Sequence, residues 1–79
     1  PVYFTLDLDV LDPSVFPGTG TPEPGGVSFE ELRKAVTLVC QKANVVACDV
    51  NELSPPYDQS GVSTMVACKI VREMLLALN

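Results

Sequence analysis

Hydrophobic and polar residues alternate over residues 2–10, which predicts a β-strand with one apolar face and one polar face. The apolar side chains are those of Val2, Phe4, Leu6, Leu8 and Val10, and the polar ones are those of Tyr3, Thr5, Asp7 and Asp9. Asp12 and Pro13 should end this strand. Proline has no N–H to donate to a sheet, and aspartate caps a turn whose first position is proline.

Glycine and proline are concentrated in residues 16–26, which indicates a long irregular loop. A loop of that length inside a compact domain is usually functional. Ser28 and Glu31 then have the spacing of a capping box, in which each side chain binds the backbone N–H of the other residue. We therefore expect a helix to begin there and to end near residues 43–44. Its expected apolar stripe consists of Leu32, Ala35, Val36, Val39 and Cys40.

The second half of the chain predicts another strand, a loop and another helix. Residues 45–50 form a short apolar run, which is typical of a strand buried on both faces. Residues 54–58 contain two adjacent prolines, so we expect a rigid loop there rather than a helix or a central strand. A last helix should extend from about Gly61 to Leu78. Its expected inward side chains are Val62, Met65, Val66, Ile70, Val71, Met74, Leu75 and Leu78.

The order of strand, helix, strand and helix predicts an α/β fold in which two parallel strands are joined by a right-handed crossover. Two parallel strands cannot cover their own faces and edges, and parallel sheets occur among further strands and helices. The chain also enters an apolar stretch directly after Pro1. We therefore expect residues 1–79 to be the C-terminal part of a single larger domain, and the chain alone to be poorly soluble or partly ordered.

The composition excludes several classes of partner. The chain has a net charge of -5, and its five basic residues form no cluster beyond Arg33 and Lys34, so nucleic acid is not expected. A cationic ligand or a metal fits this charge better. No apolar run approaches the roughly 18 to 20 residues that a membrane span needs. The three cysteines have no Cys-x-x-Cys spacing and histidine is absent, so we expect neither a zinc site nor a disulfide framework. This cysteine usage suits a reducing compartment, although it does not exclude secretion, and we expect a cytoplasmic protein.

Asp7 and Asp9, at the end of the first predicted strand, are the leading candidates for metal ligands. On one strand face their Cα atoms would lie about 6.6 to 7 Å apart. Carboxylates at that spacing can bind one cation, or two cations held roughly 3.5 to 4 Å apart. Hard oxygen ligands favour Mg, Ca or Mn over zinc. The alternative is a pair of ordinary solvated carboxylates. An EF-hand loop that starts at Asp7 is excluded, because Asp12 and Gly18 stand where glycine and glutamate are needed.

Glu52 is the third candidate, because it would follow the second predicted strand at the same edge of the sheet as the aspartates. A carboxylate there can hold a guanidinium through paired charged hydrogen bonds. It can equally bind a nearby backbone donor or an arginine, and spacing alone does not decide between these roles.

The glycine loop matches no nucleotide motif, since Glu23 stands where a third glycine would follow Gly18 and Gly20.

Three segments, in this order, resemble the ureohydrolase family of arginases and agmatinases. They are residues 4–13 (FTLDLDVLDP), residues 17–26 (PGTGTPEPGG) and residues 51–58 (NELSPPYD). The resemblance covers nearly the whole chain, and the last two segments look more like agmatinases than arginases. It implies that the chain is the C-terminal β-α-β-α portion of a larger three-layer domain with a parallel sheet.

The resemblance also implies a reaction and the residues that serve it. Asp7 would bridge two manganese ions, and Asp9 would bind one of them. Glu52 would hold the guanidinium of a small cationic substrate, while Thr19 and Thr21 would shape the pocket. The implied enzyme is a homo-oligomer with two Mn²⁺ per site that hydrolyses a guanidino compound, such as agmatine, to an amine and urea.

The other ligands of that family have no counterpart in this chain. They are a single histidine and an Asp-x-His-x-Asp motif, accompanied by a histidine on the substrate side, whereas this chain contains no histidine. We expect them before Pro1, and we expect the 79 residues alone to be inactive. Asp12 would cap the turn behind the site rather than bind metal. Two alternatives stay open: another amidino or formimino hydrolase of the family, or a non-catalytic α/β interaction module.

Overall fold

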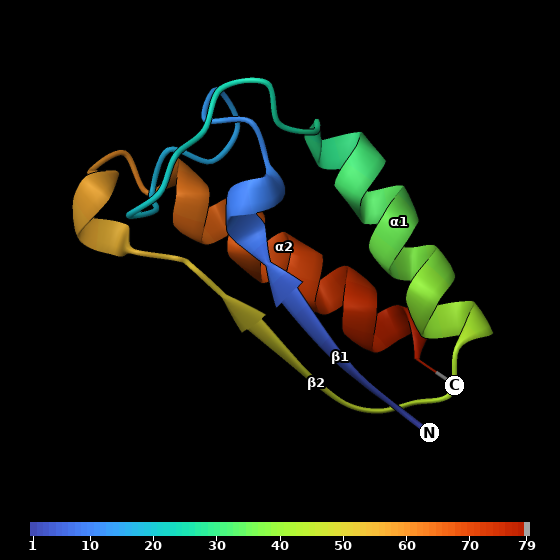
Figure 1. The fold of residues 1–79 in the computed structure, drawn as a ribbon. Coiled ribbons are helices and arrows are strands. Elements are labelled where there is room, and N and C mark those ends of the chain that lie inside the picture. Colours follow the sequence, from blue (N-terminus) through green and yellow to red (C-terminus); the bar gives the residue numbers. More distant parts are fainter. Residues whose placement is uncertain (79) are drawn as a thin grey trace.

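Two strands and two long helices alternate along the chain (Figure 1). The computed structural model describes residues 1–78, and its elements are β1 (Val2–Asp7), α1 (Phe29–Lys42), β2 (Val45–Asn51) and α2 (Val62–Ala77). Two short 3₁₀ turns follow the strands, at Leu8–Val10 and at Pro55–Tyr57. The predicted α/β order of strand, helix, strand and helix is confirmed.

β1 and β2 form a parallel sheet of two strands, as predicted. In its register Phe4 pairs with Cys48, and Asp7, the last residue of β1, pairs with Asn51, the last residue of β2. The C-terminal ends of both strands therefore lie at the same edge of the sheet. Both candidate segments, the one at Asp7 and the one at Glu52, start from this edge.

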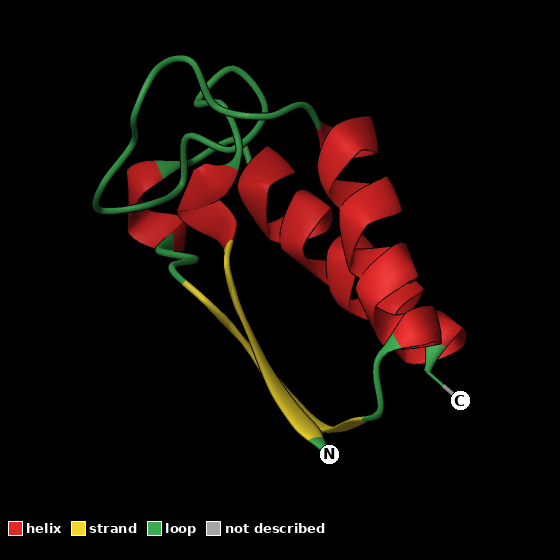
Figure 2. Cartoon of the chain, turned by 45° about the vertical axis from the view of Figure 1, so that its right-hand side comes forward, coloured by secondary structure: helices red, strands yellow, loops and turns green. Residues whose placement is uncertain are grey.

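The helices lie on one side of the sheet and pack against each other (Figure 2). The core fills the space between these two layers, and its buried apolar residues are Leu6, Leu8, Leu11, Phe16, Leu32, Val36, Cys40, Ala67, Ile70 and Met74. No helix within residues 1–78 has the length and apolarity needed to cross a membrane.

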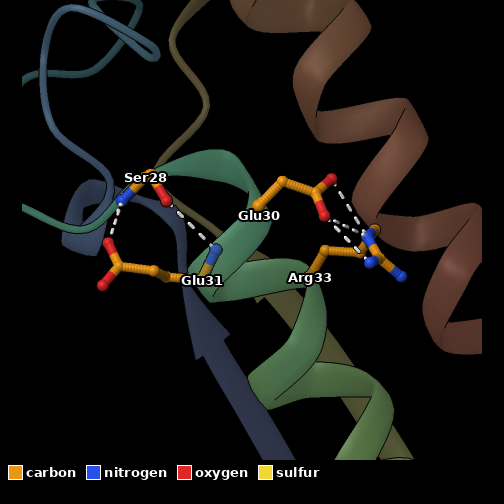
Figure 3. A network of polar contacts seen from close by, with 4 residues as sticks. All are labelled: Ser28, Glu30, Glu31 and Arg33. Atoms are coloured by element: carbon orange, nitrogen blue, oxygen red, sulfur yellow. Dashed lines mark hydrogen bonds and ion pairs between the residues drawn. The ribbon is translucent and has the colours of Figure 1, made fainter.

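α1 begins with the predicted capping box (Figure 3). The Ser28 N–H donates to Glu31 Oε1 at 2.8 Å, and the Glu31 N–H donates to Ser28 Oγ at 3.1 Å. One turn further on, Arg33 Nη2 lies 2.9 Å from Glu30 Oε2 on the outer surface. The helix ends at Lys42, close to the predicted end. Its buried residues are Leu32, Val36 and Cys40, whereas Ala35 is exposed, so the apolar stripe is narrower than predicted.

The prediction that the first strand extends to residue 10 is wrong. β1 ends at Asp7, whose side chain accepts the Asp9 N–H at 3.1 Å and so starts a 3₁₀ turn. Residues three apart lie on the same side of such a turn. This places both Leu8 and Leu11 in the core and leaves Val10 exposed. The alternating pattern had predicted that Asp7 and Asp9 share one strand face. They do not, because Asp9 lies in the 3₁₀ turn.

Two further local predictions need correction. β2 is not buried on both faces within the described chain, because the helices cover only one face of the sheet and leave Val46 and Ala47 exposed. The segment predicted as a rigid loop contains a 3₁₀ turn at Pro55–Tyr57. Its prolines occupy the first positions of the turn, where a helical backbone leaves the N–H without an internal partner.

α2 has nearly the predicted bounds, and the prediction of its inward face is correct for Ile70 and Met74, which are buried, but only in part for the rest. Its buried residues are Ser63, Ala67, Ile70 and Met74. Four side chains predicted to point inward are exposed, namely Val62, Met65, Val71 and Leu75. Apolar residues occur around most of this helix, so the hydrophobic pattern did not define a single face.

Candidate metal centre

Asp7 and Asp9 lie next to each other where β1 passes into the 3₁₀ turn. Asp7 Oδ1 accepts the Asp9 N–H at 3.1 Å. Desolvation raises the pKa of the Asp7 carboxyl, and the nearby Asp9 carboxyl raises it further, while the Asp9 N–H opposes both effects. Two carboxylates this close disfavour each other's charge, and a cation bound between them would relieve that repulsion.

Thr21 lies against the second of these aspartates. Its hydroxyl donates to Asp9 Oδ2 at 2.6 Å, from the loop that follows the turn. The structure thus places Thr21 where it orients a candidate metal ligand, which is the usual role of a side chain behind such a ligand. Thr19 is buried, and its hydroxyl has no hydrogen-bond partner within residues 1–78. A role for either threonine in shaping a substrate pocket stays a prediction.

Glu52 follows β2 directly and is exposed. Its neighbour Asn51 is the register partner of Asp7, so Glu52 starts from the same edge of the sheet as the aspartates. Its backbone has a φ of 78°, a region that glycine tolerates and other residues seldom occupy. Strained backbone of this kind is concentrated at functional sites. The predicted location of Glu52 at the aspartate edge is therefore confirmed, while its role stays a prediction.

A hydrogen-bond cluster that the sequence did not predict lies on the sheet face away from the helices. The carboxylate of Asp49 accepts hydrogen bonds from Tyr3 at 2.5 Å, from Thr5 at 2.6 Å and from Asn51 Nδ2 at 2.6 Å. The Thr5 hydroxyl, more than the other donors, holds the pKa of Asp49 below its usual value. The cluster joins the two strands just before Asp7 and Glu52. Its signals in the sequence were the alternation of Tyr3 and Thr5 on the polar face of the first strand and that of Asp49 and Asn51 in the second.

Asp12 organises the loop behind the aspartates, as predicted. Its Oδ2 accepts hydrogen bonds from the backbone and the hydroxyl of Ser14, and its Oδ1 accepts the N–H groups of Gly25 at 2.9 Å and Gly26 at 3.2 Å. These donors, with the Ser14 hydroxyl first, lower the pKa of Asp12 to about 2. A Cβ at Gly26 would lie 2.5 Å from the Val10 carbonyl oxygen, so only glycine fits there.

The donor set suits a hard cation but is incomplete within this chain. Within residues 1–78, no group of three or more His, Cys, Asp or Glu side chains could hold a metal ion. Asp7 and Asp9 each use one carboxylate oxygen in the hydrogen bonds described above. A carboxylate has two oxygens, so each can bind a cation through the other one. Oxygen donors of this type suit Mn²⁺, Mg²⁺ or Ca²⁺.

Comparison with known proteins gives consistent matches over the whole chain. A model of the arginase family matches residues 1–77. The chain is 49% identical over 76 residues to an agmatinase of Halalkalibacterium halodurans, an alignment that covers 95% of this chain and 26% of that protein. It is 45% identical over 78 residues to the mitochondrial guanidino acid hydrolase of Homo sapiens, which covers 99% of this chain and 22% of that protein.

A solved structure matches equally well. The proclavaminate amidino hydrolase of Streptomyces clavuligerus superposes with a TM-score of 0.90 at 42% sequence identity. That match covers 98% of this chain and 25% of the other one. The present chain thus spans about a quarter of the length of the proteins that it matches.

Proposed function

This chain belongs to the arginase family, and from that premise we propose that it is the C-terminal part of a manganese-dependent enzyme that hydrolyses an agmatine-like guanidino compound to an amine and urea. The agmatinase relative supports the choice of substrate class. The names of the other two matches refer to guanidino or amidino groups. All three matches therefore support the reacting group of the substrate, whereas only the agmatinase supports the rest of it.

The observation that carries the proposal is the shared edge of the sheet. The register pairs Asp7 with Asn51, so the candidate metal ligands and Glu52 start from neighbouring strand ends. A hydrolase of guanidino compounds needs a group that activates water and a group that binds the guanidinium, close enough to act on one substrate. Parallel strands bring both requirements together at their carboxyl ends.

Asp7 and Asp9 are the residues of this chain that would hold manganese. Their hard oxygen donors fit the ion, and a bound cation would favour the charged form of the Asp7 carboxyl, whose pKa is raised by desolvation and further by Asp9. When bound, manganese would lower the pKa of a water molecule and so supply a nucleophile near neutral pH. Thr21 keeps Asp9 oriented throughout, because its hydroxyl donates to the carboxylate at 2.6 Å.

Glu52 would bind the guanidinium. A carboxylate accepts two parallel N–H donors from this planar cation, which fixes its orientation as well as its position. The backbone of Glu52 has a φ of 78°, a strained conformation of the kind that is concentrated at functional sites, and this supports the proposed role. The net charge of -5 also favours the approach of a cationic substrate.

The proposal is tested in the full-length protein with two variants. Asp7→Ala should lose bound manganese and urea release together. Glu52→Gln should keep its manganese but raise the KM for agmatine about 10- to 100-fold, because the charged hydrogen bonds to the guanidinium are lost. Glu30→Gln is the matched control, since Glu30 pairs with Arg33 on the outer surface of α1 and should leave KM unchanged. If Asp7→Ala kept its full manganese content, the metal assignment would be wrong.

The assay also separates the remaining candidate functions. Agmatine, arginine and guanidinobutyrate each give urea on hydrolysis, whereas a formimino substrate gives formamide. Urea from agmatine supports the proposal. Formamide alone would favour a formimino hydrolase, and the absence of both products in a manganese-loaded protein would favour a non-catalytic module.

A further inference from the structure

Ser63 is a buried polar residue that the proposed reaction does not use. It is the second residue of α2 and is fully inaccessible to solvent. Its hydroxyl accepts the N–H of Gly18 at 2.8 Å and donates to Asp58 Oδ2 at 2.6 Å. A buried hydroxyl with both a donor and an acceptor partner fixes the relative position of the two segments that supply them. Ser63 therefore ties the start of α2 to the glycine-rich loop.

Gly18 is held through both its backbone N–H and its carbonyl oxygen. Besides the bond from its N–H to Ser63, its carbonyl oxygen accepts the Ser54 N–H at 2.7 Å. A Cβ at this position would lie 2.7 Å from the Ser63 Cβ and 3.1 Å from the Asp58 Cβ, so the contact leaves no room for a side chain. The loop is thus pressed against α2 at this residue.

The loop leads from this contact to the candidate metal centre within three residues. Thr19 follows Gly18, is buried, and donates its N–H to the Pro17 carbonyl oxygen at 2.9 Å. Thr21 comes two residues later and donates its hydroxyl to Asp9. We expect a shift of Gly18 to move Thr21, because only Thr19 and Gly20 separate the two residues. A hydrogen bond of 2.6 Å tolerates displacements of only a few tenths of an ångström.

We propose that Ser63 is a positioning residue for the metal centre, which acts through Gly18 and Thr21 on the orientation of Asp9. This inference rests on the proposed function, because it takes Asp9 as a metal ligand. Loss of the Ser63 hydroxyl frees the Gly18 N–H, loosens the loop and weakens the hold of Thr21 on Asp9. Side chains that orient a metal ligand typically change metal affinity 10- to 100-fold. Ser63 acts one step further away, so we expect about a tenfold effect.

The test measures manganese binding in the full-length protein. Metal-depleted protein is titrated with Mn²⁺, and free Mn²⁺ is followed by electron paramagnetic resonance. Ser63→Ala should weaken the binding of manganese about tenfold. Ser60→Ala is a closely matched control, because Ser60 also donates its hydroxyl to Asp58, but to the other oxygen, and it does not contact Gly18 in the described contacts. It should stay within about twofold of wild type.

A double-mutant cycle tests the route. If Ser63 acts through Thr21, Ser63→Ala should have little further effect on manganese binding in a Thr21→Val background. Equal effects in both backgrounds, or wild-type manganese affinity in Ser63→Ala, would overturn the proposal. Should Ser63→Ala not fold, Ser63→Cys replaces the hydroxyl with a thiol, which is larger and a weaker acceptor, and wild-type affinity in that variant would overturn the proposal as well.

The same titration separates this inference from the proposed function. A wild-type protein that neither binds manganese nor releases urea would overturn both. A wild-type protein that does both, with a Ser63→Ala variant of equal manganese affinity, would overturn only the role of Ser63.

Discussion

Glu52 combines an exposed side chain with a backbone conformation that its residue type disfavours. It is the one non-glycine residue within residues 1–78 that has a positive φ. Such a conformation costs of the order of 1 to 3 kcal/mol and persists only where the surroundings enforce it. Here the preceding residue, Asn51, is fixed by its Nδ2 contacts with Asp49 and Thr5. The conformation of Glu52 therefore costs stability, which agrees with the proposed role of its side chain in substrate binding.

The strained backbone predicts a trade-off between activity and stability at Glu52. Asparagine tolerates positive φ better than glutamate does, and no buried contact is lost because Glu52 is exposed. In the full-length protein, Glu52→Asn should raise the free energy of unfolding by up to about 1 kcal/mol and abolish most urea release. Urea denaturation and the urea-release assay check both effects. Glu52→Gln keeps the strain and should leave stability unchanged, and a destabilised Glu52→Asn variant would contradict the argument.

Single residues differed in how far their roles could be predicted from sequence. Asp12 was assigned correctly as a turn cap, because its partner Ser14 is only two residues away, whereas its bonds to Gly25 and Gly26, 13 and 14 residues further on, were not predicted. The role of Ser63 was missed, because its partner Gly18 is 45 residues away in the chain. Contacts between distant segments leave no trace in residue spacing, and serine near a helix start looks like an ordinary polar residue.

The two helices begin in different ways. α1 has its own capping box, which the sequence shows directly. The N-cap residue of α2 is Gly61, which has no side chain, and the capping hydrogen bond comes instead from Asp58, three residues earlier. Asp58 Oδ2 accepts the Ser63 N–H at 2.9 Å, and Asp58 Oδ1 accepts the Ser60 N–H at 3.1 Å. A negative charge near a helix N-terminus is favourable, so this aspartate stabilises α2 as a whole.

This cap predicts a pH dependence of stability. Hydrogen bonds from Ser60 and Ser63 lower the pKa of Asp58 to about 2 from an ordinary value near 4. Because the pKa is lower in the folded state, the stabilisation is fully present above the unfolded-state pKa and is lost as the pH falls through about 2. The melting temperature of the full-length wild type should exceed that of Asp58→Asn most clearly above pH 4.

The measurement is a series of thermal melts of both proteins between pH 6 and pH 2.5. Other carboxylates also titrate in this range, but they are common to both proteins, so the difference in melting temperature isolates Asp58. This difference should shrink as the pH falls below 4. A difference that stayed constant to pH 2.5 would show that the charge of Asp58 does not stabilise α2.

The ends of the helices and strands were easier to predict from sequence than the side of a helix that packs against the core. α1, β2 and α2 were predicted to within about two residues, because caps, prolines and changes of hydrophobic period mark their ends. The 3₁₀ turn at Leu8–Val10 was missed, because its apolar residues continue the alternation of β1. The face of α2 was predicted only in part, since Ile70 and Met74 are buried as expected whereas Ser63 and Ala67 were missed. Its burial of Ser63 and Ala67, rather than Met65 and Leu75, depends on the close packing of a particular neighbour and not on hydropathy.

At the scale of the whole molecule, connectivity determines where the candidate site lies. The crossover through α1 makes the strands parallel, and parallel strands bring Asp7 and Asn51 to one edge although 44 positions separate them in the chain. This much was predictable from the order of the elements. The uncovered sheet face and the exposed apolar side of α2 follow from the same topology, since two helices on one side leave the other side open (Figure 2).

These open surfaces predict how the 79-residue chain behaves on its own. Several large apolar side chains are more than half exposed, namely Val46 (65%), Met65 (72%), Leu75 (62%) and Leu76 (68%). Burial of apolar surface contributes about 25 cal/mol of favourable free energy per Å², so contiguous exposed apolar side chains favour association. We expect the purified chain to self-associate at micromolar concentrations, and the double substitution Leu75→Gln and Leu76→Gln to reduce this association. Light scattering after size-exclusion chromatography measures both, and a monomeric wild-type chain that melts cooperatively would show that these surfaces need no partner.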